Sequence, residues 1–172
     1  YVVFGQASGF SAAMNLSSLD GSNGFRLDGE ALNDLSGSSV STAGDVNGDG
    51  FDDLIVGAFR ADPNGTDSGS SYVVFGKASG FSATMNLSSL DGSNGFRLNG
   101  VAAGDLSGGS VSNAGDVNGD GFDDLIVGAD SAGSNGYNSG SSYVVFGQAS
   151  GFSAAMNLSS LDGSNGFRLD GE

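Results

Sequence analysis

The chain repeats itself with a fixed period of 71 residues. The pentapeptide that begins at Tyr1, Tyr-Val-Val-Phe-Gly, returns at Tyr72 and again at Tyr143. The first two copies differ at 14 of 71 positions, and residues 143–172 are identical to residues 1–30. A period of this length indicates a supersecondary unit that buries its apolar faces against neighbouring units in a stack.

Each period contains four segments that we expect to be β-strands, which predicts an all-β fold. Apolar runs such as Leu54-Ile55-Val56 are typical of strands that are covered on both faces. Four antiparallel strands with covered faces predict a β-propeller blade. Gly and Ser interrupt every window long enough for a helix, so Ala83 to Leu90 is expected to be a loop or a single turn. The predicted strands of one period are Ser39 to Val46, Asp53 to Ala58, Ser70 to Gly76 and Phe96 to Asn99.

The chain holds about two and a half such blades. Residues 1–28 predict a half-sheet, the third and fourth strands of a preceding blade, and residues 39–99 and 110–170 each predict a full blade. Propellers close with about 4 to 8 blades. We therefore expect a partial propeller in which further blades or self-association cover the terminal faces. The start at Tyr1, without a leader, also favours a fragment of a longer protein.

Two identical acidic loops are the most informative motif. Asp45-Val46-Asn47-Gly48-Asp49-Gly50-Phe51-Asp52-Asp53 returns as Asp116 to Asp124. Oxygen side chains stand at positions one, three, five and nine, and a Gly stands at position six, where the chain must turn sharply. Such hard oxygen donors favour Ca²⁺ over Zn²⁺ or Cu²⁺. The predicted ligands of two Ca²⁺ sites are Asp45, Asn47, Asp49, the carbonyl of Phe51 and Asp53, then Asp116, Asn118, Asp120, the carbonyl of Phe122 and Asp124.

An EF-hand is the competing interpretation, because the first six loop residues match its pattern. It fails at position twelve, where Val56 and Val127 replace the bidentate Glu, and strands rather than helices are expected on either side. A plain turn rich in Asp, Asn and Gly is the other alternative. Asp52 and Asp123, at position eight, are expected to face solvent.

The stretch from Gly44 to Ala58, followed by Tyr72-Val73-Val74-Phe75-Gly76, resembles the FG-GAP repeat, the blade unit of the integrin alpha-subunit propeller and of many bacterial surface proteins. The resemblance covers essentially the whole chain. It implies a seven-bladed propeller with Ca²⁺ in the hairpin between the first two strands of a blade. It also implies an extracellular or cell-surface location and a role in adhesion or ligand recognition. One departure is that Phe59 and Asp130 replace the Pro that ends the usual motif.

Composition narrows the possible partners and activities. The net charge is -15, from 20 acidic against five basic residues, so a nucleic acid backbone would be repelled. No apolar run is long enough to predict a membrane span. The chain has no His and no Cys, so an ordinary Ser or Cys nucleophile lacks its base, and we expect no intrinsic catalysis.

The differences between copies favour a binding surface for an unknown protein or glycan. Ten of the 14 fall in the two loops expected opposite the calcium hairpins, at positions 28, 30, 32, 33, 59, 60, 62, 63, 66 and 67. Variable loops on a rigid scaffold commonly carry recognition, although neutral drift in exposed loops would look similar. A structural spacer, or the accessory propeller of a larger secreted hydrolase, remains an alternative function.

Overall fold

The computed structural model describes residues 1–172 as an all-β fold of twelve short strands and three 3₁₀ turns. The strands are β1 (Val2–Val3), β2 (Gly24–Asp28), β3 (Ser39–Gly44), β4 (Asp53–Ala58), β5 (Ser70–Val74), β6 (Thr84–Asn86), β7 (Gly95–Asn99), β8 (Ser110–Gly115), β9 (Asp124–Ala129), β10 (Ser141–Val145), β11 (Ala155–Asn157) and β12 (Gly166–Asp170). The turns are η1 (Leu16–Ser18), η2 (Leu87–Ser89) and η3 (Leu158–Ser160).

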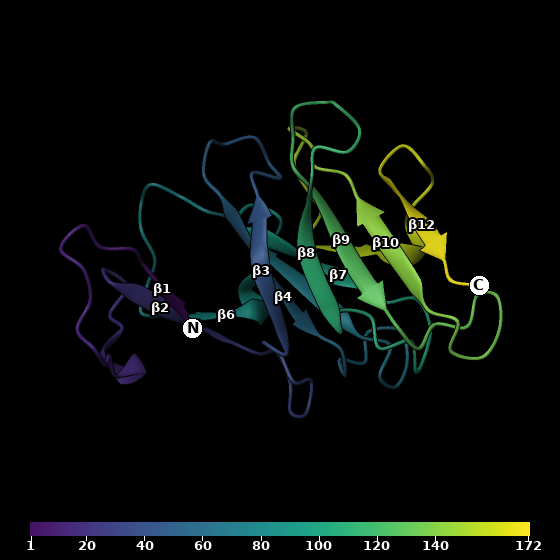
Figure 1. Cartoon of the computed structure of the whole chain (residues 1–172), viewed down its shortest axis with the longest axis horizontal. Coiled ribbons are helices and arrows are strands. Elements are labelled where there is room, and N and C mark those ends of the chain that lie inside the picture. Colours follow the sequence, from purple (N-terminus) through teal and green to yellow (C-terminus); the bar gives the residue numbers. More distant parts are fainter.

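The strands form two propeller-like blades and a smaller sheet. The first blade is β3-β4-β5-β7 and the second is β8-β9-β10-β12, each antiparallel throughout. At the N-terminus only β1 and β2 pair in this way, and we call them the half-sheet. In Figure 1 the purple half-sheet, the blue first blade and the green-to-yellow second blade follow one another across the molecule.

The expectation for Ala83 to Leu90 was partly wrong. This segment contains the 3₁₀ turn η2, but β6 precedes it and pairs in parallel with β2 of the half-sheet. In the same way, β11 lies between β10 and β12 in the chain but pairs in parallel with β7 of the first blade. Each blade therefore extends a strand back to the edge of its predecessor. Three-residue strands carry no pattern of their own, because only the neighbouring edge makes them strands.

Buried apolar side chains fill the junctions between successive units. The larger cluster joins Ile55, Val73 and Phe96 of the first blade to Leu125 and Val145 of the second. A smaller cluster lies on the opposite face of the first blade and includes Val56, Tyr72 and Leu87, with Leu27 of the half-sheet packed against it. Both faces of the first blade are therefore covered, and this explains why its strands are continuously apolar and do not alternate between apolar and polar residues.

Three aromatic rings meet at each junction. Phe75 and Phe96 of the first blade lie with ring centroids 5.9 Å apart, and Phe152 of the second blade stacks on Phe96 at 4.1 Å. At the half-sheet, Phe81 stacks on Phe25 at 4.2 Å in the same arrangement. The incoming ring always belongs to the segment that leads into the added parallel strand. This ring and strand together form the connection between units.

The half-sheet lacks the inner pair of strands that both blades possess. A hollow of about 430 Å³ lies between it and the first blade, lined mainly by apolar residues that include Val2, Leu27, Val40 and Leu54. These residues lie beside the place that inner strands would occupy in a complete unit.

Candidate functional site

Both acidic loops connect the first and second strands of a blade. The first joins β3 to β4 and the second joins β8 to β9, and both lie at the upper edge of the molecule in Figure 1. Strand β3 ends after a register shift between Thr42 and Gly44, and the same shift occurs before Gly115 in β8. The predicted strand Ser39 to Val46 therefore ends earlier, and the loop begins at its first Asp.

The first loop is held by its own side chains. Oδ1 of Asp45 accepts hydrogen bonds from the N–H groups of Gly48 (2.8 Å) and Asp49 (3.0 Å), and Oδ2 accepts from Gly50 (2.9 Å). Oδ1 of Asp49 accepts from the N–H of Phe51 at 2.9 Å. Asn47 accepts from the N–H of Asp49 at 2.9 Å and donates to Oδ2 of Asp49 at 3.1 Å. Asx-type bonding of this kind lets the Asp and Asn side chains hold the turn through its main-chain N–H groups.

The second loop reproduces this network. Asp116 accepts from the N–H groups of Gly119 (2.7 Å), Asp120 (3.0 Å) and Gly121 (2.9 Å). Asn118 donates to Oδ2 of Asp120 at 2.9 Å, and Oδ1 of Asp120 accepts from the N–H of Phe122 at 3.0 Å. Two identical sequences thus adopt one local conformation in two different blades.

The ninth residue of each loop is fully buried and joins the loop to the third strand. Asp53 accepts from the N–H of Val46 at 3.1 Å and from the N–H of Gly76, just after β5, at 2.8 Å. Asp124 bonds Val117 and Gly147 in the same way, at 2.9 Å each. A Cβ at position 76 would lie 2.5 Å from the carbonyl oxygen of Asp52, which explains the Gly that follows the Phe of this motif.

The carboxylates of the first loop influence one another. Burial raises the pKa of Asp53 to about 7, the N–H groups of Gly76 and Val46 oppose that shift, and the charges of Asp49 and Asp45 add to it. The like charges act because these side chains share one short loop. A cation bound among them would remove this repulsion.

The donor set fits a hard cation, although no three acidic side chains converge on one point that could hold an ion. Each carboxylate accepts from a different set of N–H groups, within its own loop for the first and fifth residues and also just after the third strand for the ninth. A carboxylate oxygen offers about two lone pairs, and most of these oxygens accept a single hydrogen bond. Asp45, Asn47, Asp49 and Asp53, with the carbonyl of Phe51, therefore retain free lone pairs and stay a predicted ligand set, as do their counterparts in the second loop.

The expectation for position eight holds in one loop and is wrong in the other. Asp52 is exposed. Asp123 is half-buried, and its Oδ2 accepts the N–H of Asp45 across the blade junction at 2.9 Å, while its own N–H donates to the carbonyl of Asp45 at 3.2 Å. Asp52 has no such neighbour, because the half-sheet contains no acidic loop. The repeat pattern carried no signal for this contact, since Asp52 and Asp123 occupy equivalent positions.

A second candidate surface lies at the opposite end of the first blade, among the variable loops. Oε2 of Glu30 accepts from the Tyr72 hydroxyl at 2.9 Å and from Nη1 of Arg97 at 2.8 Å. Burial and this bond raise the pKa of Tyr72. A hollow of about 250 Å³ adjoins these residues, and the variable residues Leu32, Asp62 and Pro63 also line it. The sequence pointed to these loops through their variation, but not to the contact of Tyr72 with Glu30.

The equivalent positions of the second blade differ in chemistry. Val101 replaces Glu30 and packs against the junction core. Arg168 pairs instead with Asp170, where the first blade has Asn99, and the Nε to Oδ1 distance is 2.6 Å. The two blades therefore share their acidic loops but not the surface at the other end.

The comparisons with known proteins agree with the motif. The FG-GAP repeat family model matches residues 36–74 and 107–145, the segments that contain the first three strands of each blade. A search of curated proteins returns no match. FG-GAP repeats occur in integrin-like and other extracellular proteins, and none of the helical turns in this chain has the length or apolar character needed to cross a bilayer. The two matched segments, each with its acidic loop and the first three strands of its blade, are thus FG-GAP repeats.

Proposed function

We propose that the chain binds two Ca²⁺ ions, one in each acidic loop. The observation that carries this proposal is that both loops hold the same series of Asp and Asn side chains on one and the same hydrogen-bonded turn, which the first Asp of each loop organises. Asp45, Asn47, Asp49, the Phe51 carbonyl and Asp53 would hold the first ion, and Asp116, Asn118, Asp120, the Phe122 carbonyl and Asp124 the second. The ion would offset two of the three negative charges of the carboxylates and stiffen the hairpin that connects two inner strands.

Isothermal titration calorimetry tests this proposal directly. We expect two sites per chain, with dissociation constants of about 10⁻⁴ to 10⁻³ M, the range of extracellular modules. Mg²⁺ should bind more weakly, because it sheds its water reluctantly and demands octahedral geometry. A stoichiometry of zero, or a preference for Zn²⁺, would reject the assignment.

The proposed biological role is recognition of a protein or glycan ligand by a propeller at the cell surface or outside the cell, within an integrin-like ring of about seven blades. The supporting observation is the hollow beside Glu30, Leu32 and Asp62, which is lined in part by residues that differ between the repeats. Rigid blades that present variable loops are suited to such binding. Glycan arrays and matrix proteins would be screened against the chain, with Leu32→Ser and Asp62→Ala as variants. Binding that is unaffected by either change would place the ligand away from this hollow, and a screen in which nothing binds would favour a spacer role.

We propose no catalytic role for these blades. The mutual contacts of Tyr72, Glu30 and Arg97 have a structural explanation, since each satisfies another's hydrogen-bonding group within the first blade and its leading loop. A spacer, or an accessory propeller attached to a secreted hydrolase domain, would use the same fold. A chain that binds calcium but binds none of the screened glycans and matrix proteins would favour those alternatives.

A further inference from the structure

The second acidic loop lies directly against the first. The N–H of Asp45 donates to Oδ2 of Asp123 at 2.9 Å, and the N–H of Asp123 donates to the carbonyl oxygen of Asp45 at 3.2 Å. Both residues are half-buried at the junction between the first and second blades. Asp45 is the first residue of the first loop, and its carboxylate accepts three N–H groups of the turn that follows. The second loop therefore holds the residue that organises the first.

Two further contacts join the second blade to the first loop. The aromatic ring of Phe122 lies against Gly48, where an added Cβ would collide with it. The N–H of Gln148 donates to the carbonyl oxygen of Val46 at 2.9 Å. Gly147 makes this approach possible, because a Cβ there would lie 2.7 Å from the Cβ of Phe122 and 3.0 Å from the carbonyl oxygen of Val46. The first loop is thus contacted at its positions one, two and four.

The contacting residues of the second loop lie between its own proposed calcium ligands. Asp123 follows Phe122, whose carbonyl is one proposed ligand, and precedes Asp124, whose carboxylate is another. Asp124 is fully buried and already held by two N–H groups. The N–H of Phe122, by contrast, is held only by Oδ1 of Asp120, on the exposed part of the turn, at 3.0 Å. An ion in the second loop would therefore fix the main chain that leads into Asp123.

We propose that the two calcium sites bind cooperatively, because Phe122 and Asp123 of the second loop position Asp45 and Gly48 of the first. This inference rests on the proposed function of both loops as calcium sites. Once the second loop is fixed by its ion, the first loop has less conformational freedom to lose when it binds its own ion. Coupling between two binding sites is reciprocal, so an ion in the first loop favours binding in the second by the same factor.

Charge opposes this coupling. An ion in one loop weakens the negative potential that attracts an ion to the other. The central carboxylates, Asp49 and Asp120, are exposed, so salt at physiological ionic strength screens their effect beyond about 8 Å. The contact of Asp123 with Asp45 is direct and half-buried, and salt screens such a contact much less. The coupling should therefore be positive at physiological salt and should grow as the salt concentration rises.

Calorimetry of three proteins measures the coupling. Asp49→Ala retains only the second site, Asp120→Ala retains only the first, and the unaltered chain retains both. If the sites are independent, the overall association constant for two ions equals the product of the two single-site constants. We expect the overall constant to exceed that product by about fivefold or more. Equality would overturn the inference and leave two calcium sites in place, whereas a stoichiometry of zero would reject the proposed function and the inference together.

Variants of Asp123 test whether this residue is the link. The same three measurements are repeated with Asp123→Ala added to each protein, and the excess over the product should largely disappear. Asp123→Asn keeps an acceptor for the N–H of Asp45 and should retain most of the excess. A contact with only a structural role would change the affinity of the first site without changing the excess. An undiminished excess in the Asp123→Ala proteins would overturn the proposed link.

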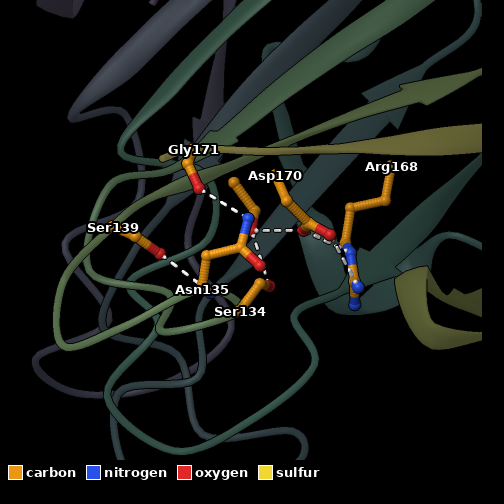
Figure 2. Close-up of polar contacts among 7 residues, drawn as sticks. Ser134, Asn135, Ser139, Arg168, Asp170 and Gly171 are labelled. Atoms are coloured by element: carbon orange, nitrogen blue, oxygen red, sulfur yellow. Dashed lines mark hydrogen bonds and ion pairs between the residues drawn. The ribbon is translucent and has the colours of Figure 1, made fainter.

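Asn135→Ala is the matched control for a general loosening of the second blade. Its loop joins β9 to β10, so it lies at the other end of β9 from the acidic loop. Figure 2 shows Asn135 beside Asp170, with its amide group donating to the carbonyl of Gly171 at 2.9 Å. Loss of this bond should leave the excess unchanged. If Asn135→Ala reduces the excess as much as Asp123→Ala does, loosening of the blade explains the coupling and the inference is wrong.

Amide hydrogen exchange of Asp45 gives a second readout that does not depend on the binding constants. In Asp49→Ala only the second loop retains its proposed site, but the N–H of Asp45 can still donate to Asp123. Calcium should therefore slow exchange of this amide severalfold, because exchange reports local opening of the loop. The double variant Asp49→Ala with Asp120→Ala should show no such effect of calcium. Unchanged exchange of Asp45 in Asp49→Ala, with calcium bound at the second loop, would overturn the inference.

Discussion

The two acidic loops have the same sequence and the same internal hydrogen bonds, but they lie in different surroundings. Val46 of the first loop is fully buried, whereas Val117 of the second is 52% exposed. The difference arises because the second blade covers the first loop: Asp123 bonds the N–H of Asp45, and the N–H of Gln148 donates to the carbonyl of Val46 at 2.9 Å. No further blade covers the second loop in the same way. A neighbour, and not the loop sequence, decides how firmly each loop is held.

Removal of the central carboxylate of a loop should have the largest effect on calcium binding, and this effect should be the same in the two loops. Asp49→Ala or Asp120→Ala is expected to reduce the calcium stoichiometry from two sites to one, because each removes a proposed direct ligand on the turn. Asp52→Ala should leave both sites intact. Calorimetry of the three variants measures this, and equal losses for Asp49→Ala and Asp52→Ala would show that the assumed ligand positions are wrong.

Truncation of the Val at position two should destabilise the chain in the first loop but not in the second. Val46→Ala removes buried methyl groups from the junction core and should lower the free energy of unfolding by about 1 to 2 kcal/mol. Val117→Ala alters a half-exposed side chain and should change it by less than about 0.5 kcal/mol. Urea denaturation of the two variants in calcium provides the comparison. Equal destabilisation would mean that the second blade does not cover the first loop in solution.

The contact of Asp123 with Asp45 should make the first loop dependent on the second blade. Asp123→Ala removes an acceptor for the Asp45 N–H and should cost about 1 kcal/mol, together with a few-fold weaker calcium affinity at one site. Asp52→Ala, the equivalent change in the first blade, has no such contact to lose. If both variants bind calcium as the unaltered chain does, the contact contributes nothing to the site.

Proton release should accompany calcium binding at the first loop. Burial raises the pKa of Asp53 to about 7 in the folded, calcium-free chain, from 3.8 as the ordinary value. Between these values the folded chain holds a proton that the unfolded chain has lost, so this group contributes most stability below pH 4, and the contribution is lost as the pH rises through 7. Calcium favours the carboxylate, so binding should release a fraction of a proton at pH 6.5 and almost none at pH 8.5. Calorimetry in two buffers of different ionisation enthalpy measures that number, and equal release at both pH values would contradict the assignment.

Much of the fold followed from local patterns. The four strands of each unit were predicted with their ends within two residues, because apolar runs and Gly-rich turns mark them within a single period. The family resemblance is confirmed by the FG-GAP match. The loop ligands remain predictions, since their chemistry can be read from nine residues but their coordination of an ion cannot.

The sequence by itself determined the repeat, the strand order, the acidic loops and the family. Only the tertiary structure decided that β6 and β11 join preceding units, that Asp123 reaches Asp45, and that Val46 is buried while Val117 is not. The physical reason is that strand and turn preferences act over a few neighbouring residues, whereas burial and pairing depend on what lies alongside in space. Identical sequences therefore fold alike within a unit and differ wherever one unit has a neighbour that the other lacks.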